Sequence, residues 1–377
     1  MNYDPKIPTA RLDKVMPSPP YYLMGQDLIC TDNNREIFIK KIFSIKPETR
    51  RGAVILAPGI ATNGNIFRID MDGNCLFMNH NQSFANLLAA EGFDVYIYHP
   101  GYTERVYNRY VARYCKTSSF YDKIYKSPSG LTFLELANTE IPLLIQYVIN
   151  HSGYEQVSWI GYSLGGMLIY AYCTENYDPY IQNIITIGSP ITFNQIFIRV
   201  VPLVNWASRA LGLEERSFLG TLSENLVPVT RLIRNLPEWL VKYNVLAPFL
   251  FNPLNISGAT VKTLLGKIVE PIPSSLESCI ENFIDRGYPS LHNHAYLYLK
   301  SLRSLQKQGK RFMFFYGPND VIAPPDSIFL AHEIISPDVP NLFEVPSAGH
   351  LDLIVGHNAR EYLWEPIVNW LKDYALL

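Results

Sequence analysis

The segment Gly161-Tyr162-Ser163-Leu164-Gly165 has the spacing of a serine nucleophile held in a sharp turn. The apolar run before it suits a buried strand, and the run after it suits a helix packed on a sheet. Strand, tight turn and helix form a nucleophile elbow, in which Gly161 and Gly165 remove Cβ atoms that would collide. The pattern predicts Ser163 as a nucleophile at a helix N-terminus, where developing negative charge is favoured. A chance match in a turn rich in glycine and serine is the alternative.

A serine hydroxyl attacks at neutral pH only with a base to take its proton, and two downstream loops offer the partners. The strand-like run 312–316 leads to Asp320, and the run 342–345 leads to His350. Both groups are expected at strand carboxyl ends, the edge at which Ser163 is expected. His350 would be the base, and Asp320 would hold its tautomer. Taken singly, Asp320 could cap a turn and His350 could be a surface histidine, but their order and placement favour the catalytic interpretation.

The other histidines are weaker candidates. His357 is the rival base, but it falls at an expected helix start. His292 and His294 are two residues apart, yet no carboxylate or third ligand follows nearby, so we expect no metal site. No cofactor is expected either, because a serine, a histidine and an aspartate suffice for acyl transfer.

The oxyanion hole needs two backbone N–H donors aimed at the developing charge. The N–H of Leu164, directly after the nucleophile, is one candidate. The N–H of Ile60, in the loop after the expected strand 53–56, is the other, with Gly59 allowing close approach of the backbone. Asn63 is expected to support this loop by hydrogen bonding.

Strand-like and helix-like segments alternate along the chain. Two apolar runs flanking the turn-rich segment 31–35 predict a hairpin. The later segments predict βαβ units and therefore a mostly parallel, doubly wound α/β sheet. The expected strands are 27–30, 37–42, 53–56, 94–98, 157–160, 184–187, 312–316 and 342–345, and the expected helices include 83–91 and 132–150.

One interval lacks strand-like runs. Residues 191–310 are helical in pattern, rich in apolar side chains and interrupted by proline and glycine. They predict an inserted helical cap, or lid, in a core made of 21–190 and 311–377, after an N-terminal arm at 1–20. A second helical layer whose apolar side is simply buried is the alternative.

Composition limits the class of protein. The 377 residues are 48% apolar and 18% charged, with a formal net charge of −2. The length and the apolar content are ample for a large core. The net charge close to zero gives no electrostatic reason to expect a nucleic-acid partner. The five cysteines are scattered without C-x-x-C spacing, and the N-terminus lacks the apolar core of a signal peptide. A soluble, cytoplasmic protein is the default expectation, with export without a signal left open.

The chain resembles serine hydrolases of the α/β-hydrolase fold from about Ala53 to Trp370. Within that superfamily, the segments 350–356, 58–63, 81–85 and 92–95 resemble acid lipases and the hydrolase partners of cholesterol-oxidase-type proteins. Similarity to polyhydroxyalkanoate synthases is weaker, because those polymerases carry cysteine where this chain has Ser163. Asp94 and Asp352 are expected to be structural.

The resemblance and the residues together imply a lipase- or esterase-type enzyme acting on carboxylic esters through an acyl-enzyme. The apolar cap favours an apolar acyl chain, a small-molecule or lipid ester as substrate, and transient contact with lipid surfaces. Two alternatives stay open: an acyltransferase that uses the same triad, and a binding protein of the same fold without activity. The oligomeric state has no signal in the sequence.

Overall fold

The computed structural model describes residues 22–30, 36–44, 50–70, 73, 83–103, 131–192, 234–244, 247–288 and 295–374. The expected N-terminal arm at 1–20, residues 193–233 of the expected cap, His292 and His294 lie outside this described part.

Eight strands of the described chain form one sheet. They are β1 (Tyr22–Cys30), β2 (Glu36–Ser44), β3 (Gly52–Ala57), β4 (Phe93–His99), β5 (Val157–Tyr162), β6 (Ile181–Ile187), β7 (Arg311–Tyr316) and β8 (Leu342–Glu344). Their order in the sheet is β1-β2-β4-β3-β5-β6-β7-β8. β1 and β2 form an antiparallel hairpin and β2 pairs antiparallel with β4, whereas every pair from β4 to β8 is parallel. The predicted hairpin and mostly parallel sheet are confirmed.

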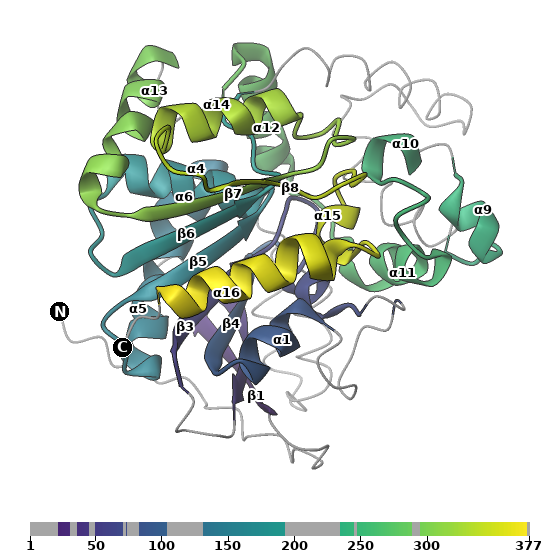
Figure 1. The fold of residues 1–377 in the computed structure, drawn as a ribbon, viewed down its shortest axis with the longest axis horizontal. Helices are drawn as coiled ribbons and strands as arrows, with labels where there is room; N and C mark the ends of the chain where they lie inside the picture. The colour runs from purple at the N-terminus through teal and green to yellow at the C-terminus, as the bar shows by residue number, and fades with distance from the viewer. Residues whose placement is uncertain are drawn as a thin grey trace.

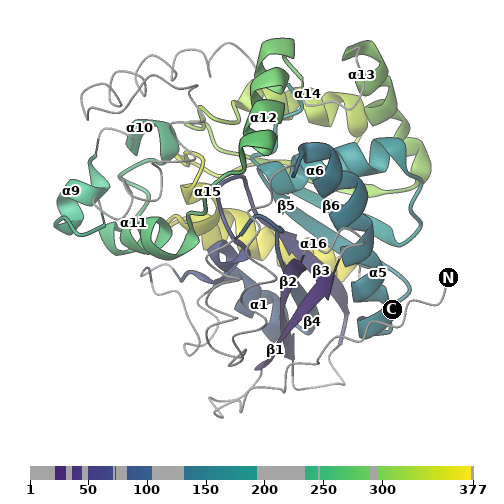
Figure 2. The same cartoon turned by 180° about the vertical axis from the view of Figure 1, so that it is seen from behind.

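Helices cover both faces of this sheet (Figures 1 and 2). One apolar cluster joins strand side chains to α5 (Ile141–Ser152), α6 (Leu164–Glu175) and α14 (Pro325–Ile335). A second cluster, on the opposite face, joins them to α1 (Phe84–Ala90) and α16 (Glu365–Asp373). Trp159 of β5 belongs to the first cluster and its neighbour Ile160 to the second, because successive strand side chains point to opposite faces.

The helix predicted over 132–150 forms with an irregularity. α4 (Phe133–Glu135) is capped by Thr132, whose hydroxyl accepts a hydrogen bond from the N–H of Glu135. A π-helical turn (Leu136–Glu140) then joins α4 to α5. Pro142 lies at the start of α5 and has no N–H to donate, which accounts for the change in hydrogen-bond pattern.

The described residues of the expected cap include short helices and contribute no strand to the sheet. They form α9 (Glu238–Lys242), α10 (Ala247–Leu250), α11 (Gly258–Thr263), α12 (Ser274–Arg286) and α13 (Ala295–Ser304). α9, α10 and α11 lie together near α15 (Asp352–Val355), at one end of the molecule (Figures 1 and 2). By contrast, Leu276 of α12 and Leu302 of α13 belong to the same buried cluster as α6 and α14. Within the described ranges, no helix is both long and apolar enough to cross a bilayer.

Candidate active site

Ser163 occupies the turn between β5 and α6. Its backbone has φ 51° and ψ −116°, a strained conformation for a residue other than glycine. The Ser163 N–H donates to the carbonyl of Ile187 at 2.8 Å, which ties the turn to the end of β6. The strand, the turn and the helix predicted around Ser163 are all present, so its side chain is raised at the carboxyl edge of the sheet.

The two elbow glycines lie where backbone segments approach each other. A Cβ on Gly165 would lie 2.3 Å from the carbonyl oxygen of Ala57, and one on Gly161 would lie 2.5 Å from the carbonyl carbon of Gly165. Both distances are far shorter than any carbon contact allows. Any larger residue would therefore push β3 or α6 away from the turn that carries Ser163.

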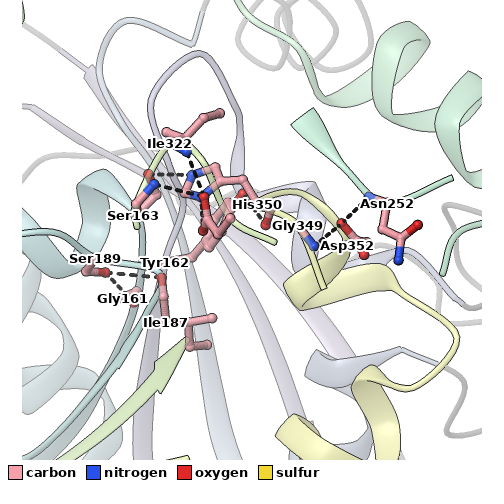
Figure 3. A network of polar contacts seen from close by, with 12 residues as sticks. Gly161, Tyr162, Ser163, Ile187, Ser189, Asn252, Ile322, Gly349, His350 and Asp352 are labelled. Atoms are coloured by element: carbon pink, nitrogen blue, oxygen red, sulfur yellow. Dashed lines mark hydrogen bonds and ion pairs between the residues drawn. The ribbon is translucent and has the colours of Figure 1, made fainter. Parts of the chain in front are cut away.

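The structure brings Ser163, His350 and Asp320 into one hydrogen-bonded chain. The Nε2 atom of His350 lies 2.9 Å from Oγ of Ser163, and its Nδ1 atom lies 2.7 Å from Oδ2 of Asp320. All three side chains are buried, and Figure 3 shows His350 directed at Ser163. With Nδ1 protonated and bonded to the carboxylate, Nε2 is free to take a proton from the hydroxyl.

Backbone groups orient the aspartate. Asp320 lies in the loop after β7, and its Oδ1 atom accepts hydrogen bonds from the N–H groups of Ile322 at 2.9 Å and Ala323 at 2.8 Å. Because these two donors hold one carboxylate oxygen, the other faces His350. His350 itself lies in the loop after β8, so the three residues meet at the carboxyl ends of three parallel strands.

Two further residues hold His350, and the sequence showed neither contact. The hydroxyl of Tyr162 donates to the backbone carbonyl of His350 at 3.1 Å, and the two rings lie 5.1 Å apart. Burial raises the pKa of Tyr162 well above its usual value, so this hydroxyl stays protonated as a donor. Asp352 accepts a hydrogen bond from the N–H of Gly349, directly before His350. In the sequence, only the positions of Tyr162 next to Ser163 and of Asp352 close to His350 could have indicated these two residues.

The loop predicted to supply the second oxyanion donor lies against the elbow. A Cβ on Gly59 would lie 3.0 Å from the ring of Tyr162 and 3.1 Å from Cβ of Ser163, so this loop passes close to the nucleophile. The Gly59 carbonyl accepts from the hydroxyl of Thr62 at 2.8 Å and from that of Tyr102 at 3.3 Å. Neither Ile60 nor Leu164 donates its N–H to an acceptor within the described residues.

Asn63 supports this loop from the other side, as the sequence suggested. Its side-chain amide donates to Oε1 of Glu270 at 2.6 Å and to the carbonyl of Lys267 at 3.0 Å. Glu270 in turn donates its N–H to the carbonyl of Ala61 at 2.8 Å, and Ala61 has a positive φ of 55°. A segment of the expected cap thereby holds the strained part of the loop.

Two other described histidines, His357 and His99, have surroundings different from those of His350. His357 lies in a turn, exposed to solvent. His99 is fully buried in β4, where burial lowers its pKa well below the usual value, and its Nδ1 accepts from the N–H of Gly64 at 3.2 Å. Among the described residues, no three histidine, cysteine, aspartate or glutamate side chains gather where they could hold a metal ion.

Comparisons with known proteins support the fold described above. No curated protein matches the chain. Similar solved structures include a carboxylesterase of the ammonia-oxidizing thaumarchaeon Nitrososphaera gargenis (13% identity, 92% of this chain and 98% of that chain, TM-score 0.56). They also include a peroxisomal alpha-beta-hydrolase from Saccharomyces cerevisiae (10% identity, 94% of this chain and 90% of that chain, TM-score 0.53). A third is a monoacylglycerol lipase of Paleococcus ferrophilus (16% identity, 90% of this chain and 99% of that chain, TM-score 0.51). At such identities the likeness concerns the fold. A family model for the alpha/beta hydrolase fold matches residues 52–245, more than half of the chain, and the chain therefore belongs to this family.

Proposed function

We propose that this protein is a serine hydrolase of carboxylic esters. The hydrogen-bonded chain from Ser163 through His350 to Asp320 carries the proposal, because it is the arrangement that activates a hydroxyl for attack on a carbonyl. Two of the structural neighbours named above are a carboxylesterase and a monoacylglycerol lipase, which agrees with this chemistry. The similarity of residues 350–356 to acid lipases favours the same class of substrate.

The reaction follows from the positions of the groups. Oγ of Ser163 attacks the ester carbonyl carbon while its proton passes to Nε2 of His350. The carbonyl oxygen becomes an oxyanion, which the N–H groups of Leu164 and Ile60 stabilise. The tetrahedral species collapses, His350 gives the proton to the departing alcohol, and an acyl-enzyme remains. Water, deprotonated by His350, then attacks the acyl-enzyme and releases the acid and free Ser163.

We propose that the expected cap, residues 191–310, covers this site through the part that precedes α12, and that the substrate carries an apolar acyl chain. The hydrogen bonds that the Asn63 amide donates to Glu270 and to the Lys267 carbonyl support the assignment, because they join the cap segment to the oxyanion loop. α12 and α13 pack on the sheet layer instead, which favours an acyl-binding role for the part of the cap that precedes them.

Apolar side chains on and after α9 support transient contact with a lipid surface. Trp239 is 64% exposed, Tyr243 59% and Leu254 78%. We expect Trp239→Ser to lower the fraction of protein that sediments with phosphatidylcholine vesicles by at least about threefold, because an interfacial tryptophan buries apolar area in the headgroup region. Leu297→Ser, at an exposed leucine of α13, is the matched control and should sediment as the wild type does. Equal sedimentation of wild type and Trp239→Ser would remove the lipid surface from the proposal.

Hydrolysis of p-nitrophenyl esters from acetate to palmitate tests the proposed function. We expect a maximum of kcat/KM at medium or long acyl chains and complete loss after treatment with a fluorophosphonate, which modifies activated serines. Activity on acetate alone would contradict the apolar acyl chain. If folded protein cleaved no ester, hydrolysis would be wrong, and product analysis with glycerol or cholesterol as acceptor would then show whether the acyl group is transferred instead.

A further inference from the structure

The buried carboxylate of Asp352 lies two residues after His350 and takes no part in the proposed reaction steps. Its Oδ1 atom accepts hydrogen bonds from the N–H groups of Gly349 at 2.9 Å and Asn252 at 3.1 Å (Figure 3). Its Oδ2 atom accepts one from Nδ2 of Asn255 at 2.8 Å. One side chain thus joins Gly349, the residue directly before His350, to the segment 252–255, about a hundred residues earlier in the chain.

The longer segment 250–255 meets the chain around His350 at several other points. The bonds run from Leu351 N–H to the Leu250 carbonyl (2.8 Å), from Asn252 Nδ2 to the Ser347 carbonyl (2.7 Å) and from His357 N–H to the Asn255 carbonyl (2.7 Å). The approach is close, because a Cβ on Gly349 would lie 2.9 Å from Cα of Phe251. Asp352 is at the centre of this junction and bonds to both sides of it.

The contacts at this junction help to fix the position of the His350 imidazole. Asp352 holds the N–H of Gly349, and the Tyr162 hydroxyl holds the carbonyl of His350, so the backbone is fixed on either side of the histidine. The imidazole must present Nε2 to Ser163 at 2.9 Å. A misplacement of about 1 Å in such a contact costs up to about a hundredfold in rate.

A buried carboxylate at position 352 lowers the stability of the fold if it serves packing alone. Burial raises the pKa of Asp352 to about 6, and among the described residues no cation forms an ion pair with it. A buried charge without a cation lowers stability, whereas an apolar side chain would fill the space without that cost. Only an acceptor satisfies the three donors that converge here.

We propose that Asp352 is a positioning residue for His350, through which segment 250–255 of the expected cap holds the base in line with Ser163. The inference rests on the proposed roles of Ser163 and His350. Among the contacts of this junction, the one between the Asp352 carboxylate and the Asn255 amide joins two side chains that can be exchanged for each other. Exchange of these two groups is therefore the sharpest test.

The exchange uses three variants of the full chain. In Asp352→Asn an amide NH₂ faces that of Asn255, and in Asn255→Asp two carboxylates face each other. Each single change should lower kcat and the rate of Ser163 labelling by a fluorophosphonate at least about tenfold, with KM within about twofold. The double variant Asp352→Asn/Asn255→Asp restores one donor and one acceptor, and it should recover both rates to within about threefold of the wild type. Asp338→Asn, at an exposed aspartate, is the control.

Each outcome bears on the proposal. Folded single variants with wild-type rates of labelling and turnover would overturn it, and so would a folded double variant that stays as slow as the singles. If Asp352→Asn does not fold, Asn255→Ala removes one hydrogen bond from the same carboxylate without changing the histidine loop. This variant should show the same tenfold slowing of turnover and labelling. A wild-type rate for Asn255→Ala would overturn the proposal. Labelling needs an activated Ser163 but no ester turnover, so it tests the role of Asp352 even if ester hydrolysis proves wrong.

Discussion

The Ser163→Ala variant should lose ester hydrolysis by about 10⁴- to 10⁶-fold, the range found when a triad serine is removed from other hydrolases. The reason is chemical: without Oγ no acyl-enzyme forms, and only the oxyanion donors and binding remain. Folding should be unaffected, because the change removes a single oxygen from a side chain in a turn that the backbone already holds through Ile187.

Initial rates on the best p-nitrophenyl ester, together with fluorophosphonate labelling, measure this loss. Ser189→Ala is the matched control, because Ser189 is also buried beside the elbow and bonds to the carbonyls of Gly161 and Ile187 but not to His350 (Figure 3). It should retain activity within about tenfold. Ester cleavage that survives Ser163→Ala, or labelling at another serine, would show that Ser163 is not the nucleophile.

The Asp320→Asn variant should lower kcat by about 10⁴-fold with little change in KM, as the equivalent change does in the protease triad. Its side-chain oxygen can still accept from Ile322 and Ala323, so the new NH₂ group faces Nδ1 of His350. That contact requires an unprotonated Nδ1 and therefore places the proton on Nε2, where it blocks transfer from Ser163. The loss arises from the wrong tautomer and not from a lost fold.

Steady-state kinetics at pH 7 to 9 and the thermal midpoint of unfolding separate the two causes. Asp326→Asn, six residues later at the exposed start of α14, is the control and should leave kcat unchanged. A fall in kcat of less than about tenfold would remove Asp320 from the triad, because a tautomer effect of this kind is far larger.

The sequence alone determined the elements that meet at the site. Glycines spaced two on either side of Ser163, a buried strand before it and a helix after it are local features, and they predicted the elbow that the structure contains. The hairpin and the parallel sheet were also predictable, because apolar strands and amphipathic helices alternate along the chain. Even the meeting of Asp320 and His350 with Ser163 follows once each loop is placed at a strand carboxyl end.

The sequence could not show how residues distant along the chain pack against these loops. Asn255 meets Asp352 across 97 positions and Asn63 meets Glu270 across 207, and no spacing or composition marks either pair. The same limit applies within the expected cap, where α12 has the apolar spacing of any amphipathic helix. Spacing shows that a helix has an apolar face, but only packing decides whether that face covers the sheet or lines the site. Tertiary structure alone therefore decided which side chains hold His350 and the oxyanion loop. A hydrogen bond forms only where two groups meet in space, and the residues next to each group in the sequence do not indicate which partner it will meet.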